Sequence, residues 1–219
     1  RLSAHMQTAQ ELNRRPSPAA RPHPLAYLGG LLWMASWDTN HIYAIDPKSW
    51  NVRHEFEAPG KPFGLSALGN ELRAVISHGE DDDRYLYRLL PDSGFDLTSK
   101  TPCPDLTGSF MAAAGDRIYL GQMTFQRILV LKPDASVERE IALPTRCGGL
   151  GFGPQGRFYM ISGDAELEHL SFGTLDISQS APAFEAIRSL PDEARSLVYD
   201  GTQWWTCLRD ADEIASFTA

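Results

Sequence analysis

The stretch LAYLGGLLWMASWDTNHIYAIDPK, residues 25–48, decides the fold. It contains two short apolar runs around a glycine pair, then a polar loop and a third apolar run that ends at an Asp-Pro turn. Apolar runs of this length between turn residues predict three β-strands joined as hairpins. In the third run, Ile-Tyr-Ala-Ile at residues 42–45, apolar side chains occupy both alternating positions. We therefore expect both faces of this sheet to be covered.

The same order of apolar runs and turns recurs four more times along the chain. Its turn glycines are Gly30, Gly69, Gly115, Gly156 and Gly201, spaced 39, 46, 41 and 45 residues apart. Glycine suits these positions because a tight hairpin often needs a positive φ. A period near 40–45 residues with several short strands per unit is typical of a β-propeller blade. The pattern predicts an all-β fold, a five-bladed β-propeller of about 40–45 residues per blade, over residues 25–219.

A β-sandwich and an α/β fold are the competing interpretations. No stretch after Leu25 has an apolar period of helix length, apart from a short turn near residues 191–195, so α/β is disfavoured. A sandwich gives no reason for the internal period. The fifth unit has three predicted strands before Ala219, so its outer strand comes from the N-terminal segment, lies beyond Ala219 or is absent.

Residues 1–24 are predicted to form an N-terminal arm or linker that either supplies this closing strand or lies on the surface. Residues 3–14 are compatible with a short helix, with apolar residues on one side. Prolines at positions 16, 18, 22 and 24 exclude helix beyond that point and disfavour a central strand. A closing strand from this arm would therefore have to lie at a sheet edge.

Composition limits the classes of partner. The chain has 219 residues, 42% of them hydrophobic, which supports a sizeable core and excludes wholesale disorder. A net charge of −8 argues against nucleic acid and anionic membrane as partners. Cys103, Cys147 and Cys207 are too scattered for a disulfide framework or a zinc site. Free thiols make the cytoplasm the default expectation, which a removed signal peptide would change, and the oligomeric state stays open.

Residues 25–48 resemble a blade of the glutamine cyclotransferase family, through an apolar-Gly-x-apolar-Trp run followed by Trp-x-Thr-Asn-x-Ile-x-x-Ile-Asp-Pro. Blades of the gluconolactonase/senescence-marker and streptogramin lyase groups are similar. The resemblance implies a five-bladed propeller and, for a cyclotransferase, cyclisation of N-terminal glutamine. Two departures argue against transfer of either activity. Ala26 stands before Tyr27 where the cyclotransferase pattern has an acid, and the metal-binding Glu-Gly-Pro opening of the gluconolactonase group is not found.

Propellers usually bind ligands where two sets of loops meet at one end of the central channel. Loops leading into the inner strands contain His23, Lys61, Phe63, Ser109, Phe110, Arg146, Cys147, Glu193 and Arg195. Loops between the second and third strands comprise residues 37–40, 78–84, 122–126, 164–166 and 209–210. We expect these loops to bring aromatic, basic and acidic side chains to one mouth.

Six residues of these loops are the predicted ligand-binding set: Trp37, Asp38, Gln122, Phe125, Arg146 and Arg195. Trp37 is expected to stack on a flat ligand, with a wedge between blades as the alternative. Arg146 and Arg195 open adjacent inner strands and suit a carboxylate or phosphate. The alternative for this pair is salt bridging to Glu193 or Asp164.

His78 and Glu193 are the candidate catalytic residues. His78 adjoins an acidic run, residues 80–83, which is compatible with a general base or a divalent metal such as calcium, or with a solvated hairpin tip. Cys147 as a nucleophile lacks a histidine placed to activate it. No Walker, GxSxG or HExxH motif is present and no organic cofactor is evident. The adjacent pair Trp204-Trp205 is predicted to point to opposite sides of the fifth blade.

These observations predict a small-molecule-binding propeller with a polar and aromatic site at the channel mouth. Whether it acts as a hydrolase, lyase or cyclising transferase stays open. The alternative is a non-catalytic scaffold or sensor that binds a protein or peptide across a propeller face. The missing family acid favours this alternative, and the convergence of polar and aromatic loop residues favours the small-molecule site.

Overall fold

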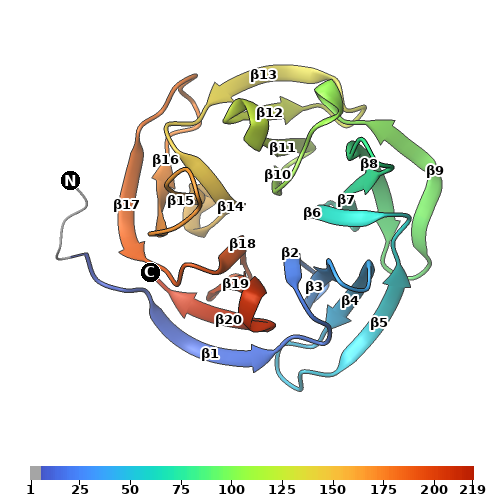
Figure 1. Ribbon diagram of the computed structural model, residues 1–219, viewed down its shortest axis with the longest axis horizontal. Helices are drawn as coiled ribbons and strands as arrows, with labels where there is room; N and C mark the ends of the chain where they lie inside the picture. The colour runs from blue at the N-terminus through green and yellow to red at the C-terminus, as the bar shows by residue number, and fades with distance from the viewer. Residues whose placement is uncertain (1–5) are drawn as a thin grey trace.

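Five antiparallel four-stranded sheets surround one axis in the computed structural model, which describes residues 6–219 (Figure 1). The predicted five-bladed β-propeller is confirmed. The strands of each blade are given from the axis outward. The first blade consists of β2 (Pro22–Leu28), β3 (Leu31–Ser36), β4 (His41–Ile45) and β5 (Val52–Glu57), and the second of β6 (Lys61–Leu68), β7 (Glu71–His78), β8 (Asp83–Leu90) and β9 (Gly94–Pro102). The third consists of β10 (Met111–Ala114), β11 (Arg117–Gln122), β12 (Arg127–Leu131) and β13 (Val137–Ala142), and the fourth of β14 (Arg146–Phe152), β15 (Phe158–Gly163), β16 (Ser171–Leu175) and β17 (Phe184–Ser189). Within the described residues, no helix is long and apolar enough to cross a bilayer.

The fifth blade is assembled from both ends of the chain. Its three inner strands are β18 (Ala194–Tyr199), β19 (Trp204–Leu208) and β20 (Glu213–Thr218), and its outer strand is β1 (Gln10–Pro16). β1 runs antiparallel to β20, from Gln10 opposite Thr218 to Pro16 opposite Glu213. The N-terminal segment therefore contributes β1 and the first residues of β2.

The helix expected over residues 3–14 is wrong where the structure describes it, because residues 10–14 belong to β1; residues 3–5 lie outside the described residues. The tertiary context overrides a weak helical pattern, since β20 offers an unpaired edge. Proline is tolerated in β1 because the strand is the outermost one and Pro16 is its last residue.

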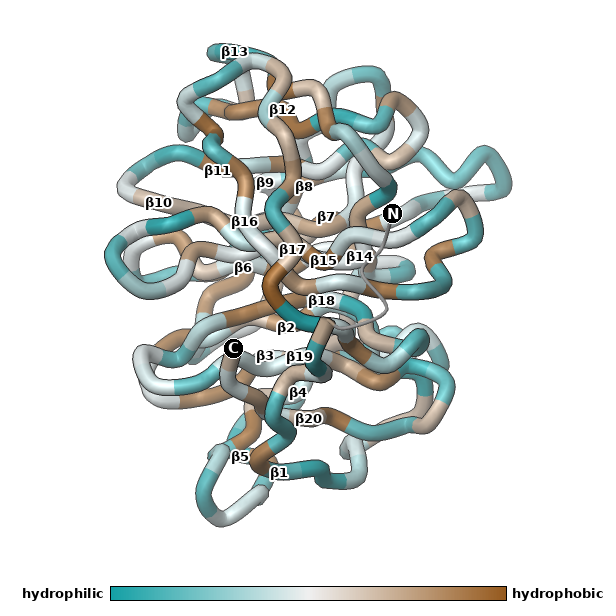
Figure 2. The backbone as a smooth tube through the Cα atoms, turned by 90° about the vertical axis from the view of Figure 1, so that its left-hand side faces the viewer, coloured by the Kyte–Doolittle hydropathy of each residue, from teal (hydrophilic) through white to brown (hydrophobic). Residues whose placement is uncertain are grey.

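Five apolar clusters hold the ring together, one between each pair of neighbouring blades. Ile42 and Ala44 pack against the second blade, whereas Tyr43 and Ile45, on the other face of β4, pack against the fifth. The pair Trp204-Trp205 divides in the same way, as the alternation predicted, between the fourth and first blades. Figure 2 shows the result as hydrophobic stretches along strands and mainly hydrophilic loops.

The inner strands are irregular near their first residues. In β2, β6, β14 and β18 a β-bulge interrupts the pairing with the second strand, at His23-Pro24, Phe63, Gly148 and Ser196-Leu197. A bulge leaves extra residues unpaired and redirects their side chains. The bulges lie at the end of the channel where the predicted ligand-binding loops meet.

At the opposite end, Glu71 at the start of β7 anchors an ion-pair network of the second blade. Its carboxylate accepts hydrogen bonds from Arg88 Nε at 2.9 Å and Arg73 Nη1 at 2.8 Å. The hydrogen bond from Arg88 is the largest influence that lowers the pKa of Glu71 to about 2. Because this folded-state pKa lies below the unfolded one, the stabilisation is present above pH ~4.5 and is lost as pH falls toward 2.

Glu71→Gln should therefore lower the melting temperature at pH 7 by about 2–4 °C, since a partly exposed network contributes about 1 kcal/mol. The gap between wild type and variant should narrow when melting is followed from pH 7 down to pH 3. Glu57→Gln removes an exposed carboxylate that has no ion pair in the described chain, and should leave the melting temperature unchanged. A gap that stays constant with pH would show that the network does not stabilise the fold electrostatically.

Candidate functional site

A cavity of about 240 Å³ occupies the end of the channel where the bulges lie. Its wall comes from the two predicted sets of loops and contains three arginines, Arg84, Arg195 and Arg209. Neither aspartate nor glutamate is among the residues of the described chain that line it. The cavity therefore concentrates positive charge in a chain whose net charge is −8.

Four aromatic rings lie together in the wall of the cavity. The imidazole of His23, which is 3% exposed, stacks on Trp37 with ring centroids 4.0 Å apart and lies 4.9 Å from Phe110. Phe63 lies 5.2 Å from Trp37. The indole N–H of Trp37 donates to the carbonyl of Pro62 at 2.7 Å, which fixes the ring between the first and second blades.

Cations cover the faces and edges of these rings. Lys61 Nζ lies 4.3 Å and Arg209 Cζ 4.5 Å from the centroid of Trp37, and Arg21 Cζ lies 5.3 Å from it. Arg84 Cζ lies 3.5 Å from the centroid of Phe63. An aromatic face attracts a nearby cation through its quadrupole. The rings thus hold basic side chains in place around the cavity that Trp37 and Phe63 line.

His23 is held neutral by its surroundings. Its Nδ1 lies 3.2 Å from Arg209 Nη1, and because a guanidinium only donates, Nδ1 accepts and the ring proton is on Nε2. Burial lowers the pKa of His23 well below its usual value, and the charges of Arg209, Arg195, Lys61 and Arg84 lower it further. The ring consequently offers the cavity a hydrogen-bond donor at neutral pH.

Arg195 is buried without a counterion. It is 7% exposed, and its Nη1 donates to the carbonyls of Asp192 at 3.0 Å and Ala194 at 2.8 Å. It forms no salt bridge within the described chain, and its buried Nε has no hydrogen-bond partner there. Burial, and then the charge of Arg209, lowers its pKa, although an arginine remains charged.

The backbone next to Arg195 has an unusual conformation that is held by hydrogen bonds. Ser196 has φ +67° within the bulge of β18, a left-handed conformation that costs a non-glycine residue of order 1–3 kcal/mol. Its hydroxyl donates to the carbonyl of His23, which offsets part of this cost and ties the fifth blade to the first. The residue after Arg195 is thereby tied to His23 on a sequence-distant strand, and Arg195 and His23 both line the cavity.

Arg84 and Lys61, on the second blade, differ in how far they are already neutralised. Arg84 donates to Asp82 Oδ2 at 2.7 Å and to the carbonyl of Gly108 at 2.7 Å. Lys61 forms no salt bridge within residues 6–219, and burial, followed by the charge of Arg21, lowers its pKa. Lys61, Arg21 and Arg195 are therefore the basic residues around the cavity that form no salt bridge within the described residues, and of these three Arg195 is the one that lines the cavity.

Of the predicted ligand-binding residues, the structure brings Trp37 and Arg195 together at the cavity. Asp38 and Arg146 are exposed and do not line it; Arg146 Nε donates to the carbonyl of Ala165 at 3.2 Å. Gln122 is buried, and its amide donates to the carbonyls of Pro104 at 2.7 Å and Thr107 at 3.0 Å. Phe125 is 49% exposed beneath Arg127.

The candidate catalytic residues lie outside the cavity. His78 Nε2 is 2.7 Å from the hydroxyl of Tyr87, and Glu193 is half-buried beside the loop that leads into β18. Cys147 does line the cavity, but burial raises the pKa of its thiol to about 12. It is therefore protonated at neutral pH and is not an activated nucleophile.

His23, Phe63, Arg84 and Arg209 line the cavity and Lys61 lies against Trp37 beside it, yet none of the five belongs to the predicted ligand-binding set. All five belong to the loops predicted to form the mouth, so the loops were identified correctly but not the residues within them. The available signal was positional: His23 and Phe63 occupy the places in the first two blades that Arg195 occupies in the fifth.

One cluster in the described chain brings three candidate metal ligands together: Asp164, Glu168 and His169, all exposed. Oxygen donors of this kind suit calcium. However, Asp164 already accepts the backbone N–H groups of Glu166 at 3.2 Å and Glu168 at 2.8 Å. Its carboxylate caps the turn before β16, and the arrangement is that of a turn motif.

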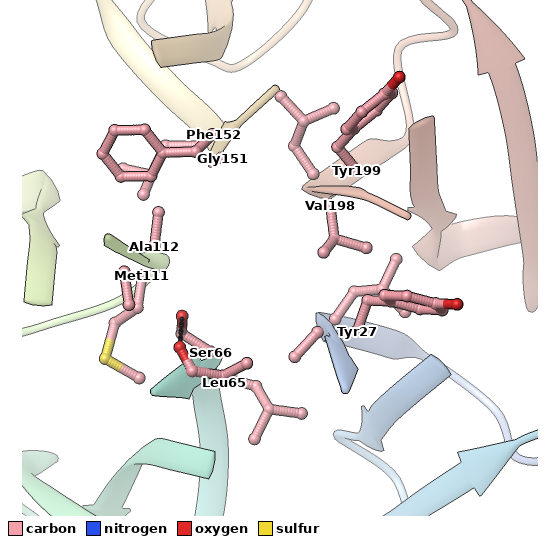
Figure 3. A pocket seen from close by; sticks show the side chains of 15 residues that line it. Tyr27, Leu65, Ser66, Met111, Ala112, Gly151, Phe152, Val198 and Tyr199 are labelled. Atoms are coloured by element: carbon pink, nitrogen blue, oxygen red, sulfur yellow. Dashed lines mark hydrogen bonds between the residues drawn. The ribbon is translucent and has the colours of Figure 1, made fainter. Parts of the chain in front are cut away.

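The other end of the channel is apolar. A funnel of about 150 Å³ there is surrounded by side chains of all five inner strands, including Tyr27, Phe152 and Tyr199, and no charged residue of the described part of the chain lines it (Figure 3). Between funnel and cavity, a constriction leaves no space for a water molecule; it is formed by Leu25, Leu65, Met111, Leu150 and Leu197, among others. The cationic cavity is thus closed at its base and opens only at its own end of the ring.

No family model and no curated protein matches the sequence. Solved structures do resemble it. Glutaminyl cyclase from Myxococcus xanthus superposes with a TM-score of 0.69 at 10% identity, covering 96% of this chain and 95% of that one. The PQQ-bound aldose sugar dehydrogenase from Streptomyces coelicolor has a TM-score of 0.60 at 15% identity over 93% and 79% of the two chains. A virginiamycin B lyase from Staphylococcus aureus, bound to quinupristin, has a TM-score of 0.58 at 15% identity over 94% and 69%. At these identities the likeness shows the fold alone, and it confirms the propeller that the cyclotransferase resemblance implied.

Proposed function

We propose that this propeller binds an anionic small molecule in the cationic cavity at one end of its channel. The observation that carries the proposal is that three arginines line the cavity and no carboxylate of residues 6–219 does. Burying a cation such as Arg195 without a partner is costly, and a negatively charged ligand removes that cost. A closed base and a volume of about 240 Å³ favour a ligand of metabolite size.

Binding is better supported than catalysis by the groups in the cavity. A hydrolase, lyase or cyclising transferase needs a base or a nucleophile near the substrate. The Nδ1 of His23 is engaged by Arg209, and the thiol of Cys147 is protonated. What the cavity offers is a group of fixed donors and positive charges, which would stabilise an anion or a developing oxyanion.

Two unpaired cations on different blades, Lys61 and Arg195, favour a ligand with more than one negative charge. Phosphate esters and dicarboxylates meet this requirement. Pyrroloquinoline quinone, held by the similar Streptomyces dehydrogenase, is a planar tricarboxylate and belongs to the same chemical class. It should be included with simpler anions in a binding screen.

The direct test is titration of the purified protein with inorganic phosphate at low ionic strength, followed by calorimetry or by NMR. We expect saturable binding with a Kd of about 1 mM or lower, which corresponds to about −4 kcal/mol. Raising NaCl to 0.5 M should weaken it, because salt screens the cations at the open mouth. Phosphate should also raise the melting temperature. Absence of saturable binding by phosphate, succinate and pyrroloquinoline quinone alike would refute the proposal.

A further inference from the structure

The wall shared by the fifth and first blades differs from the rest of the cavity. Arg195 is buried there with its Nη1 on two backbone carbonyls, while Nε and Nη2 make no hydrogen bond within the described residues. His23 faces the same cavity from β2, with Nδ1 engaged by Arg209 and its proton on Nε2. This wall therefore combines a buried, unneutralised guanidinium with an imidazole donor that has no acceptor.

We infer that the ligand's anionic group is an oxyanion, a carboxylate or a phosphate, seated between the guanidinium of Arg195 and the Nε2–H of His23. This inference rests on the proposed function, because it specifies where in the cavity the anion binds. An oxyanion fits for a chemical reason. Both protein groups present only donors, and a planar guanidinium pairs with oxygen acceptors through two parallel N–H bonds.

The other cations of the cavity are less suited to this role. Arg84 already donates to Asp82 through Nε and Nη2 and to the carbonyl of Gly108 through Nη1. Arg209 donates to His23 and lies 3.6 Å from Asp210. Lys61 has no carboxylate partner, but it is a flexible ammonium lying against Trp37 and Phe63. Arg195 is the lining arginine that has no carboxylate partner and whose Nε and Nη2 make no hydrogen bond within the described residues.

The local fold gives this seat its rigidity. Ser196, next to Arg195 in the bulge of β18, adopts a left-handed conformation, and its hydroxyl donates to the carbonyl of His23. Thr206 Oγ1 donates to the carbonyl of Ser196 at 2.8 Å and holds the bulge from the neighbouring strand. A strained backbone supported on both sides is typical of a binding site that is formed before its ligand arrives.

Phosphate titration of three charge-neutralised variants tests the inference. Arg195→Gln should weaken phosphate binding about tenfold. Lys61→Gln removes one positive charge from the same mouth but leaves Arg195 and His23 unchanged, and should weaken phosphate binding threefold or less. Arg146→Gln, an exposed arginine on the same face outside the cavity, should leave the affinity unchanged. Melting curves establish that each variant is folded.

The outcomes separate this inference from the proposed function. If wild type binds phosphate but Lys61→Gln and Arg195→Gln lose equal affinity, the anion is not seated on Arg195, although the anion site stands. If wild type does not bind phosphate or the other anions, the proposed function itself fails. Should Arg195→Gln not fold, ¹⁵N NMR of His23 in the wild type decides. The free protein should show the Nε2–H tautomer, and phosphate should shift the Nε2 resonance. An unmoved resonance at saturation would overturn the inference that the anion binds between Arg195 and His23.

Discussion

Removal of residues 1–16 should lower the melting temperature of the protein by at least about 10 °C. This segment contains β1, which forms the outer strand of the fifth blade along the whole of β20. β1 also reaches both neighbouring blades. Near its start, Ala9 N–H donates to the carbonyl of Ser189 in the fourth blade at 3.0 Å, and at its end the carbonyl of Pro16 accepts the indole N–H of Trp50 in the first blade at 2.7 Å.

The size of this effect follows from the number of hydrogen bonds that the truncation removes. The hydrogen bonds to the neighbouring blades and the β20 ladder contribute about 1 kcal/mol each, so losing several of them removes 4 kcal/mol or more. For a chain of this length each kcal/mol corresponds to about 2–4 °C. The truncated protein also exposes the edge of β20, which invites association with other chains.

Complementation provides the control. A synthetic peptide of residues 6–16, added to the truncated chain, should restore most of the lost melting temperature in a concentration-dependent way. The same peptide with proline in place of Arg14 should restore less, because proline cannot donate to the ladder. A truncated chain that melts within 3 °C of the full one would show that the ring does not depend on β1.

Trp37→Leu should weaken phosphate binding at least about thirtyfold. Trp37 is the common neighbour of Lys61, Arg209 and His23. Leucine keeps an apolar side chain at this position but removes the aromatic face. The two closest cation–π contacts, from Lys61 and Arg209, then disappear at about 1 kcal/mol each, and the mutually repelling cations move outward into water. A loss of about 2 kcal/mol corresponds to a factor of about thirty in affinity.

Trp37→Phe is the matched variant, since it retains a π face and loses the indole N–H. It should cost less than fivefold in affinity, as measured by the same NMR titration, with the circular dichroism spectra of both variants unchanged. If the Trp37→Leu variant binds phosphate as tightly as the wild type does, then the indole ring does not position the cations, and the aromatic residues of the cavity serve only in packing.

Much of the fold could be predicted from the sequence because its determinants are local. The aligned turn glycines all adopt positive φ, from +59° at Gly115 to +102° at Gly201, as a tight turn requires. Alternating apolar residues on β4 divide between two clusters, as a sheet packed on both faces requires. The closing strand was less visible, since β1 is largely exposed and its sequence carries a competing helical pattern.

The site was predictable only to the level of its loops. Arg146 is the first residue of β14 and Arg195 the second residue of β18, and the sequence predicted both as ligand-binding residues. Only Arg195 is turned into the channel, because the bulge at Ser196 places it there, whereas Arg146 bonds to the carbonyl of Ala165 at the surface. Gln122 resembles a polar ligand-binding residue in sequence, yet its amide is consumed by two loop carbonyls.

The amino-acid sequence by itself determined the repeat, the blade count and the end of the channel at which polar loops gather. Each of these depends on neighbours within about 45 residues, through strand alternation and turn conformation. Only the tertiary structure decided that His23, Trp37, Arg84, Arg195 and Arg209 line one cavity to which no carboxylate of the described residues contributes. That juxtaposition joins three blades and both ends of the chain, and the directions of its side chains depend on bulges and cation–π contacts that no local pattern encodes.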